Sequence, residues 1–366
     1  MSIMSEISSC PPLTRESVAA AAELIKPYIH LTPVHTSTTL NTIASTPQTP
    51  EDLAGTEWEG QKPARPKIRL FFKCENYQKI GAFKARGAFH AVSRLTSEQR
   101  SKGVITHSSG NHAQALALAA QTFGIPAYIV MPTISTPSKI AGTQALGAKV
   151  IFSGSTSVDR EAKVAEVQKE HPGVVLVPPY DHPNIILGQG TASLEFEQQV
   201  ENLGTNLDAI ITPLGGGGLL AGTATAMYGT GIRVFGSEPR YQGANDGERG
   251  LKEGKRIETV STLTIADGLR TPVGVINWEI ISDPNKLKGI YSVTEEQIIK
   301  AMRLVLERMK IFVEPSACVP LAVVLYNEDF RQMVEKEAGE DGWNVGVIFS
   351  GGNTTVEAIA KLFPQA

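Results

Sequence analysis

Cysteine is scarce in this chain of 366 residues, which contains only Cys10, Cys74 and Cys318. Three cysteines so far apart exclude a disulfide framework and a cysteine-based zinc cluster. We therefore expect a protein of a reducing compartment, and the cytoplasm is the natural choice. The first 13 residues also lack the basic start and apolar core of a secretory signal, in agreement with that expectation.

The chain has neither a strong charge excess nor a long apolar run. Its 34 basic and 37 acidic side chains give a net charge of −3, so the composition does not indicate binding to nucleic acid or to an anionic membrane. No apolar run approaches the ~20 residues of a membrane-spanning helix. Hydrophobic residues make up 42% of the chain, enough for a buried core. The length fits two domains, or one large α/β unit split into two lobes.

From Gly103 onwards, short β-branched runs alternate with longer helical patterns. This alternation predicts βαβ units and a mostly parallel sheet. Residues 45–66 differ, because they are rich in proline, threonine, glycine and charge, and we expect a mobile surface insertion there. The expected strands are 104–107, 127–131, 149–152, 174–177, 209–212, 233–236 and 345–349, and the expected helices include 111–123, 138–146, 159–170, 191–203 and 295–309.

Lys84 stands among small residues at the start of a predicted helix, in the stretch Lys-Ile-Gly-Ala-Phe-Lys-Ala-Arg-Gly-Ala-Phe that runs from 79 to 89. A lone lysine in such a place is usually a solvated charge. Here the small neighbours leave room for a bulky ligand, and Phe83 is placed to pack against it. A dry pocket lowers the pKa of a lysine, and the resulting free amine can form a Schiff base with an aldehyde.

Ser108-Ser-Gly-Asn-His112 follows an apolar run and leads into a predicted helix. Gly110 permits an unusual turn, and backbone N–H groups at a helix start favour a carboxylate. The alternative interpretation is a simple helix cap, since serine and asparagine both cap well. For His112, a ligand role and a role as a hydrogen-bonded core histidine remain equally open.

The four glycines from Gly215 to Gly218 come after a second apolar run and open another predicted helix. Four successive glycines cost backbone entropy, which folding alone rarely requires. A nest of N–H groups at a helix start binds phosphate, and we predict that function for the individual residues Gly215, Gly216, Gly217 and Gly218. The spacing matches neither the dinucleotide fingerprint nor a Walker loop.

Ser350 closes the last predicted strand, in Phe349-Ser-Gly-Gly-Asn353. Its hydroxyl is of the right kind to hydrogen-bond a pyridine nitrogen, and in place of a carboxylate it would leave that nitrogen unprotonated. An ordinary Ser-Gly turn is the alternative interpretation. With an aldehyde-binding lysine, a carboxylate-binding loop and a phosphate cup, the sequence predicts a site for pyridoxal 5′-phosphate.

In combination, these motifs resemble the second fold type of pyridoxal-phosphate enzymes, in particular the serine/threonine dehydratase and serine racemase group. The resemblance extends from Leu31-Thr-Pro33 to Ser350-Gly-Gly-Asn353, and the matching stretches also include Phe72-Lys-Cys-Glu75, Phe83-Lys-Ala-Arg-Gly87, Gly188-Gln-Gly-Thr191, Ala266-Asp-Gly268 and Glu314-Pro-Ser316. It implies a two-lobed α/β fold like that of tryptophan synthase β, with parallel-rich twisted sheets flanked by helices. A large cofactor-binding domain would comprise 1–102 and 182–366, a small mobile domain would comprise 103–181, and the protein would form a homodimer.

The resemblance also implies roles for individual residues. Lys84 would be the Schiff-base lysine and the base on one face of the substrate Cα, and Ser109 the base on the other face. Asn111 would bind the cofactor phenolate oxygen, and Ser350 the pyridine nitrogen. The substrate would contact Ser108, Ser109, Asn111, His112 and Arg160.

A magnesium or calcium site is implied as well, formed by Glu238, the carbonyl of Ala244, and Asp246. Oxygen ligands suit such hard cations. The loop that carries them is two residues longer than in the mammalian racemases, and a polar surface loop is the alternative interpretation.

The leading functional hypothesis is elimination of water from a β-hydroxy amino acid such as L-serine or L-threonine, which gives an α-keto acid and ammonia. A racemase, a 3-hydroxyaspartate dehydratase and a specialised biosynthetic or repurposed relative remain alternatives. Ala113, Tyr180-Asp181 and the 45–66 insertion depart from the mammalian racemases, which leaves the choice of substrate open.

Overall fold

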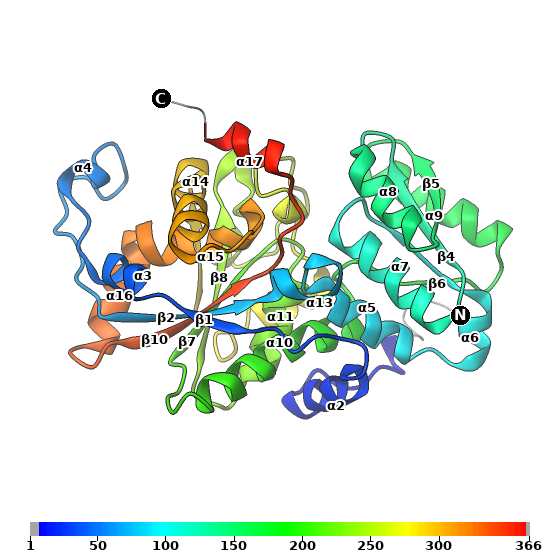
Figure 1. Ribbon diagram of the computed structural model, residues 1–366, viewed down its shortest axis with the longest axis horizontal. Helices are drawn as coiled ribbons and strands as arrows, with labels where there is room; N and C mark the ends of the chain where they lie inside the picture. The colour runs from blue at the N-terminus through cyan, green and yellow to red at the C-terminus, as the bar shows by residue number, and fades with distance from the viewer. Residues whose placement is uncertain (1–6, 364–366) are drawn as a thin grey trace.

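The computed structural model describes residues 7–363, which form two separate β-sheets (Figure 1). The larger sheet has six strands in the order β1-β2-β10-β7-β8-β9. Only β1 runs antiparallel to its neighbour, and every other pair is parallel. The strands are β1 (Val34–Thr36), β2 (Ile68–Cys74), β7 (Ala209–Pro213), β8 (Arg233–Pro239), β9 (Gly289–Val293) and β10 (Trp343–Phe349).

Helices cover both faces of this sheet, as Figure 1 shows. Since β7 and β10 are buried along their whole length, they read in the sequence as continuous apolar runs. One face packs on α3 (Thr38–Ser45), α14 (Glu295–Leu304), α15 (Pro315–Tyr326) and α16 (Glu328–Ala338). The other packs on α2 (Arg15–Ile25), α10 (Pro183–Glu201), α11 (Gly218–Met227) and α13 (Val275–Ile281).

The smaller sheet is entirely parallel and has the strand order β5-β4-β3-β6. Its strands are β3 (Val104–His107), β4 (Ala127–Pro132), β5 (Lys149–Ser153) and β6 (Val175–Leu176). Helices α7 (Asn111–Phe123) and α8 (Pro137–Ala145) lie on one side, and α9 (Ser157–Glu170) packs against the other. A capping box between Thr156 and Asp159 starts α9.

Helix α5 (Lys84–Ser93) joins the two lobes, because it packs on α7 of the smaller one and on α10 of the larger one. Glycines permit the approach to α10. A Cβ at Gly188 would lie 2.7 Å from the Cα of Gly87, closer than real Cβ atoms come. Glycine at both positions therefore allows the N-terminal half of α5 to lie in direct backbone contact with α10.

The remaining helices are peripheral: α4 (Pro50–Leu53), α6 (Ser97–Lys102), α12 (Asp246–Glu253) and α17 (Val356–Leu362). Helix α4 belongs to the 45–66 segment, for which the sequence predicts a mobile surface insertion. Most of the segment lies at the surface, and its buried residues Leu53, Trp58 and Ala64 pack it onto the large lobe, while its mobility stays a prediction. Among residues 7–363, none of the helices has both the length and the apolarity needed to cross a bilayer.

Candidate active site

Lys84 is the first residue of α5 and lies at the junction of the two lobes. The preceding N–H, of Phe83, donates to the carbonyl oxygen of Ser350 over 3.0 Å. The Lys84 amine donates to the carbonyl oxygen of Pro179 over 2.6 Å and lies 5.2 Å from the centroid of the Phe83 ring. Burial lowers the pKa of Lys84 to about 8. A neutral, nucleophilic amine is therefore accessible close to physiological pH.

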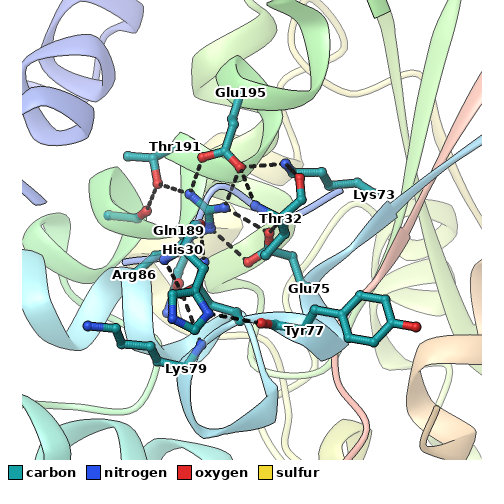
Figure 2. A network of polar contacts seen from close by, with 12 residues as sticks. His30, Thr32, Lys73, Glu75, Tyr77, Lys79, Arg86, Gln189, Thr191 and Glu195 are labelled. Atoms are coloured by element: carbon teal, nitrogen blue, oxygen red, sulfur yellow. Dashed lines mark hydrogen bonds and ion pairs between the residues drawn. The ribbon is translucent and has the colours of Figure 1, made fainter. Parts of the chain in front are cut away.

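The first turn of α5 is fixed by a buried charge network, shown in Figure 2. Arg86 is fully buried and forms a two-pronged contact with Glu75, at 2.7 and 2.8 Å. It also reaches Glu195 of α10 at 3.0 Å, and Glu195 in turn pairs with buried Lys73 at 2.5 Å. Two acids and two bases balance in charge, and the network ties the segment after Lys84 to β2 and α10.

The four glycines form the turn between β7 and α11, as predicted. Gly217 has φ of +98°, a conformation that side chains disfavour. A Cβ on Gly216 would lie 2.3 Å from Cγ of Tyr180, so no other residue fits there without movement of that ring. The Gly216 carbonyl accepts bonds from Asn277 Nδ2 (2.7 Å) and from the N–H of Gly274 (3.0 Å). The loop is thus a compact turn at a helix N-terminus, a setting that suits a phosphate, and phosphate binding there stays a prediction.

Asn111 begins α7, as predicted, and faces the large lobe. Its Nδ2 lies 3.2 Å from one oxygen of Glu314, and its Oδ1 accepts from Asn353 Nδ2 over 2.7 Å. The N–H of Asn353 donates to Glu314 over 3.0 Å. Burial and the charge of Asp267 raise the pKa of Glu314 to about 7. Sequence reasoning missed this role of Glu314 and Asn353, although both stand in motifs that it identified.

The Ser108–His112 loop, which includes Asn111, leads from the end of β3 into α7. The Ser108 hydroxyl accepts the N–H of Gly110 over 3.3 Å, which supports the turn, and Ser109 is partly buried. His112 is 1% exposed and donates from Nε2 to the Val177 carbonyl over 3.1 Å. Burial lowers the pKa of His112 to about 3, so the ring is neutral. That contact fixes the loop, and a contact of His112 with substrate stays a prediction.

Arg160 lies in the first turn of α9, where Nη1 donates to the Ser155 carbonyl over 3.1 Å. Burial and, secondly, the charge of Arg160 lower the pKa of His107. The influence on His107, the last residue of β3, places Arg160 on the side of the small lobe that carries the Ser108–His112 loop.

Glu238 and Asp246 form a buried carboxylate pair beside the glycine turn. Both Glu238 oxygens accept backbone N–H groups, from Gly247 (2.8 Å) and Glu248 (2.9 Å), and Asp246 accepts that of Val273 (3.0 Å). Burial, and then the charge of Asp246, raise the pKa of Glu238 well above its usual value, and burial raises the pKa of Asp246 to about 6. Among residues 7–363, no cluster of three or more His, Cys, Asp or Glu side chains suited to a metal occurs.

Two residues that sequence reasoning identified only as departures also belong to the site. Tyr180 packs against Gly216 and Gly218, and it follows Pro179, the residue that Lys84 contacts. Asp181 accepts the N–H groups of Val275 and Ile276 at the start of α13, at 2.8 and 2.9 Å. The Pro179–Asp181 segment therefore brings the lysine, the glycine turn and α13 together.

This arrangement fits pyridoxal phosphate, because it combines a partly buried amine of lowered pKa with a glycine turn at a helix N-terminus, where a Cβ on Gly216 or Gly217 would collide with neighbouring side chains. Comparison with known proteins agrees. The family model of pyridoxal-phosphate dependent enzymes matches residues 58–351. The serine racemase of Schizosaccharomyces pombe is 39% identical over 355 residues, which cover 96% of this chain and 98% of that one. The L-threo-3-hydroxyaspartate ammonia-lyase of Saccharomyces cerevisiae is 40% identical over 352 residues, covering 95% and 96%.

Among solved structures, the serine racemase of Dictyostelium discoideum superposes with a TM-score of 0.79 at 40% identity, covering 94% of this chain and 99% of the racemase. The chain therefore belongs to the family of pyridoxal-phosphate dependent enzymes. Within it, this is a fold-type II enzyme of the serine/threonine dehydratase and serine racemase group, of the lyase or isomerase class. The predicted family, pyridoxal phosphate as its cofactor, and the α/β fold class are confirmed.

Proposed function

We propose that the protein is a dehydratase (ammonia-lyase) that converts a β-hydroxy amino acid such as L-serine or L-threonine to an α-keto acid and ammonia. The observation that carries this proposal is the buried Lys84 amine, whose pKa is lowered to about 8 and which donates to Pro179, the residue before the Tyr180 that packs on the glycine turn. Relatives in both arms of the group, a serine racemase and a 3-hydroxyaspartate ammonia-lyase, support the class of substrate.

Pyridoxal phosphate, when bound, acidifies the substrate Cα and accepts its electrons. Lys84 would hold it covalently and then take the Cα proton. Phe83 would pack against its ring, Gly215–Gly218 would bind its phosphate, and Asn111 its phenolate oxygen. Ser350 is buried, and its hydroxyl makes no hydrogen bond within residues 7–363, so it is available to the pyridine nitrogen. Ser108, Ser109, Asn111, His112 and Arg160 would receive the substrate, mainly its carboxylate.

Racemisation is the second candidate function, and the presence of Ser109 favours it. A hydroxyl on the Ser108–His112 loop could return a proton to the face of Cα opposite Lys84. We propose that the same site performs both reactions and that elimination dominates when the β-carbon carries a leaving group. A 3-hydroxyaspartate substrate falls within the same chemistry.

We further propose that a magnesium or calcium ion binds Glu238, the Ala244 carbonyl and Asp246. Two carboxylates lie buried close together, and their pKa values are raised by burial and, in Glu238, also by the neighbouring charge, which supports a site of this kind. The short protein ligand set suits an ion that keeps several waters. Asp246 contacts Val273, and the adjacent Gly274 contacts Gly216, so the ion would support the phosphate cradle from outside.

We also propose a domain division, an oligomeric state and a location for the protein. Two separate sheets support a division into a large cofactor-binding domain (1–102 and 182–366) and a small mobile domain (103–181). Exposed Leu31, Tyr77 and Phe312 support a homodimer. Within residues 7–363, Cys10, Cys74 and Cys318 form no disulfide bond, which supports a cytoplasmic location.

The test is to incubate the purified enzyme with L-serine, L-threonine and L-threo-3-hydroxyaspartate and to assay keto acid and D-isomer together. We expect keto acid from at least one substrate. The Lys84→Ala variant should lose turnover and the borohydride-reducible bond to the cofactor. Full turnover in that variant, or D-isomer without keto acid in the natural enzyme, would overturn the proposed function.

A further inference from the structure

The 45–66 segment is held firmly on α16, so its side chains have defined positions. Trp58 is 4% exposed and donates from Nε1 to Asp329 over 2.9 Å. Buried Glu328 accepts from Gln48 Nε2 over 2.6 Å and from the N–H of Ala64. The segment is thus attached near both its ends and at its centre, and Glu57 lies next to the central attachment.

Glu57 reaches away from α16 to the loop between β8 and α12. Its Oε1 lies 2.9 Å from Nη2 of Arg240, which is the second residue after Glu238. Arg240 also contacts the hydroxyl of Ser292 through Nε, over 3.3 Å. The β8–α12 loop and the 45–66 segment therefore touch each other.

From Arg240 the contacts continue to the buried carboxylates. The Ser292 hydroxyl donates to Glu248 over 2.5 Å. The Glu248 N–H donates to Glu238 over 2.9 Å, which fixes one oxygen of that carboxylate. Ser292 and Glu238 are also neighbours in the sheet, where they face each other across β8 and β9. Arg240 is thus linked through the Ser292 hydroxyl to the side chain of Glu248, the residue whose backbone N–H holds Glu238.

We propose that the 45–66 segment is a strap that positions the carboxylate pair for its cation through Glu57 and Arg240. This inference rests on the cation site proposed above. Glu57 and Arg240 are positioning residues that do not touch the ion. The strap restrains the β8–α12 loop, which must hold Glu238 and Asp246 together against their mutual repulsion when the ion leaves.

We expect loss of the Glu57–Arg240 ion pair to have a modest effect on cation binding. The Glu57 and Arg240 side chains are 51% and 38% exposed, and an ion pair of that kind is worth little in water. Loss of the pair should therefore weaken cation binding roughly two- to five-fold. Activity at saturating cation should stay unchanged, because neither residue lies in the catalytic machinery.

In the experiment, the chelator-treated holoenzyme is titrated with calcium chloride or magnesium chloride. Calorimetry measures the binding of the ion, and the thermal unfolding midpoint is measured with and without it. Glu57→Gln should weaken binding and reduce the cation-dependent rise of the midpoint. Glu51→Gln is the matched control, because Glu51 is an exposed acid in the same segment that has no ion pair within residues 7–363. In an Arg240→Gln background, Glu57→Gln should have no further effect, since Glu57 acts through Arg240.

The outcomes separate the two proposals. If the natural holoenzyme binds neither ion, the cation site is wrong and the strap falls with it. If it binds an ion and Glu57→Gln binds it equally well, only the strap is wrong. The strap would also be wrong if Glu57→Gln and Glu51→Gln lost cation affinity equally, or if Glu57→Gln lost as much affinity in the Arg240→Gln background as in the natural enzyme. Either result would show that acidic charge attracts the ion over a long range. Equal unfolding midpoints in chelator would show that the variants are folded.

Discussion

The side-chain amide of Asn277 donates to the carbonyl oxygen of Gly216 over 2.7 Å, a contact between residues 61 positions apart. It fixes the carbonyl of the second glycine of the turn, which also accepts the N–H of Gly274. Asn277 belongs to α13, whose first turn is held by Asp181. The geometry of the predicted phosphate cradle is therefore determined by a helix that the glycine motif itself does not include.

Asn277→Ala should weaken cofactor binding roughly five- to ten-fold, because the net contribution of a buried hydrogen bond is about 1 kcal/mol. The measurement is the dissociation constant for pyridoxal phosphate, obtained from visible absorbance after equilibrium dialysis. Asn285→Ala is the control, since Asn285 makes only an exposed contact with Asp283. Equal affinities for natural enzyme and Asn277→Ala would show that α13 does not control the cradle.

Arg86→Ala should destabilise the fold by about 3–5 kcal/mol, because it leaves the buried Glu75 and partly buried Glu195 without their partner. Lys26→Ala, which breaks an ion pair whose side chains are 73% and 76% exposed, should change the stability by less than about 0.5 kcal/mol. Urea denaturation with the cofactor removed measures both, since bound cofactor would add its own stabilisation. Similar losses in the two variants would contradict the view that the buried network fixes α5.

The residues proposed for the centre of this site stand in local sequence patterns, whereas the residues that support them do not. Lys84, the four glycines and Ser350 stand in local patterns whose physical reasons, lowered pKa and backbone freedom, are visible in a few residues. Glu314 contacts Asn111 across 203 positions, and no local pattern announces that contact. The packing of Trp58 against α16 was missed for the same reason: the polar composition of 45–66 suggests mobility, whereas its few apolar residues find partners far away in the chain.

Capture of pyridoxal phosphate by the cofactor-free enzyme should accelerate with pH and level off above pH 8. Burial lowers the pKa of Lys84 to about 8, so the neutral amine increases about ten-fold per pH unit below that value and changes little above it. An unshifted lysine would continue to gain up to about pH 10.4. The rate of appearance of bound-cofactor absorbance between pH 6 and 10 distinguishes the two. A rate still rising ten-fold between pH 9 and 10 would rule out the lowered pKa.

Ser109→Ala should remove D-isomer formation while leaving elimination from the L-substrate largely intact. Lys84 takes the Cα proton on one face, and expulsion of the β-hydroxyl then needs no group on the other. Inversion does need a proton donor there, and Ser109 lies on the loop that precedes Asn111, at the end of β3. The measurement assays keto acid and D-serine from the same L-serine reaction, with Ser109→Thr as the variant that keeps the hydroxyl. D-isomer formation should survive in Ser109→Thr more than in Ser109→Ala. If Ser109→Ala reduced elimination and racemisation equally, Ser109 would be a carboxylate-binding or structural residue, and the assignment of a separate base to each face would be wrong.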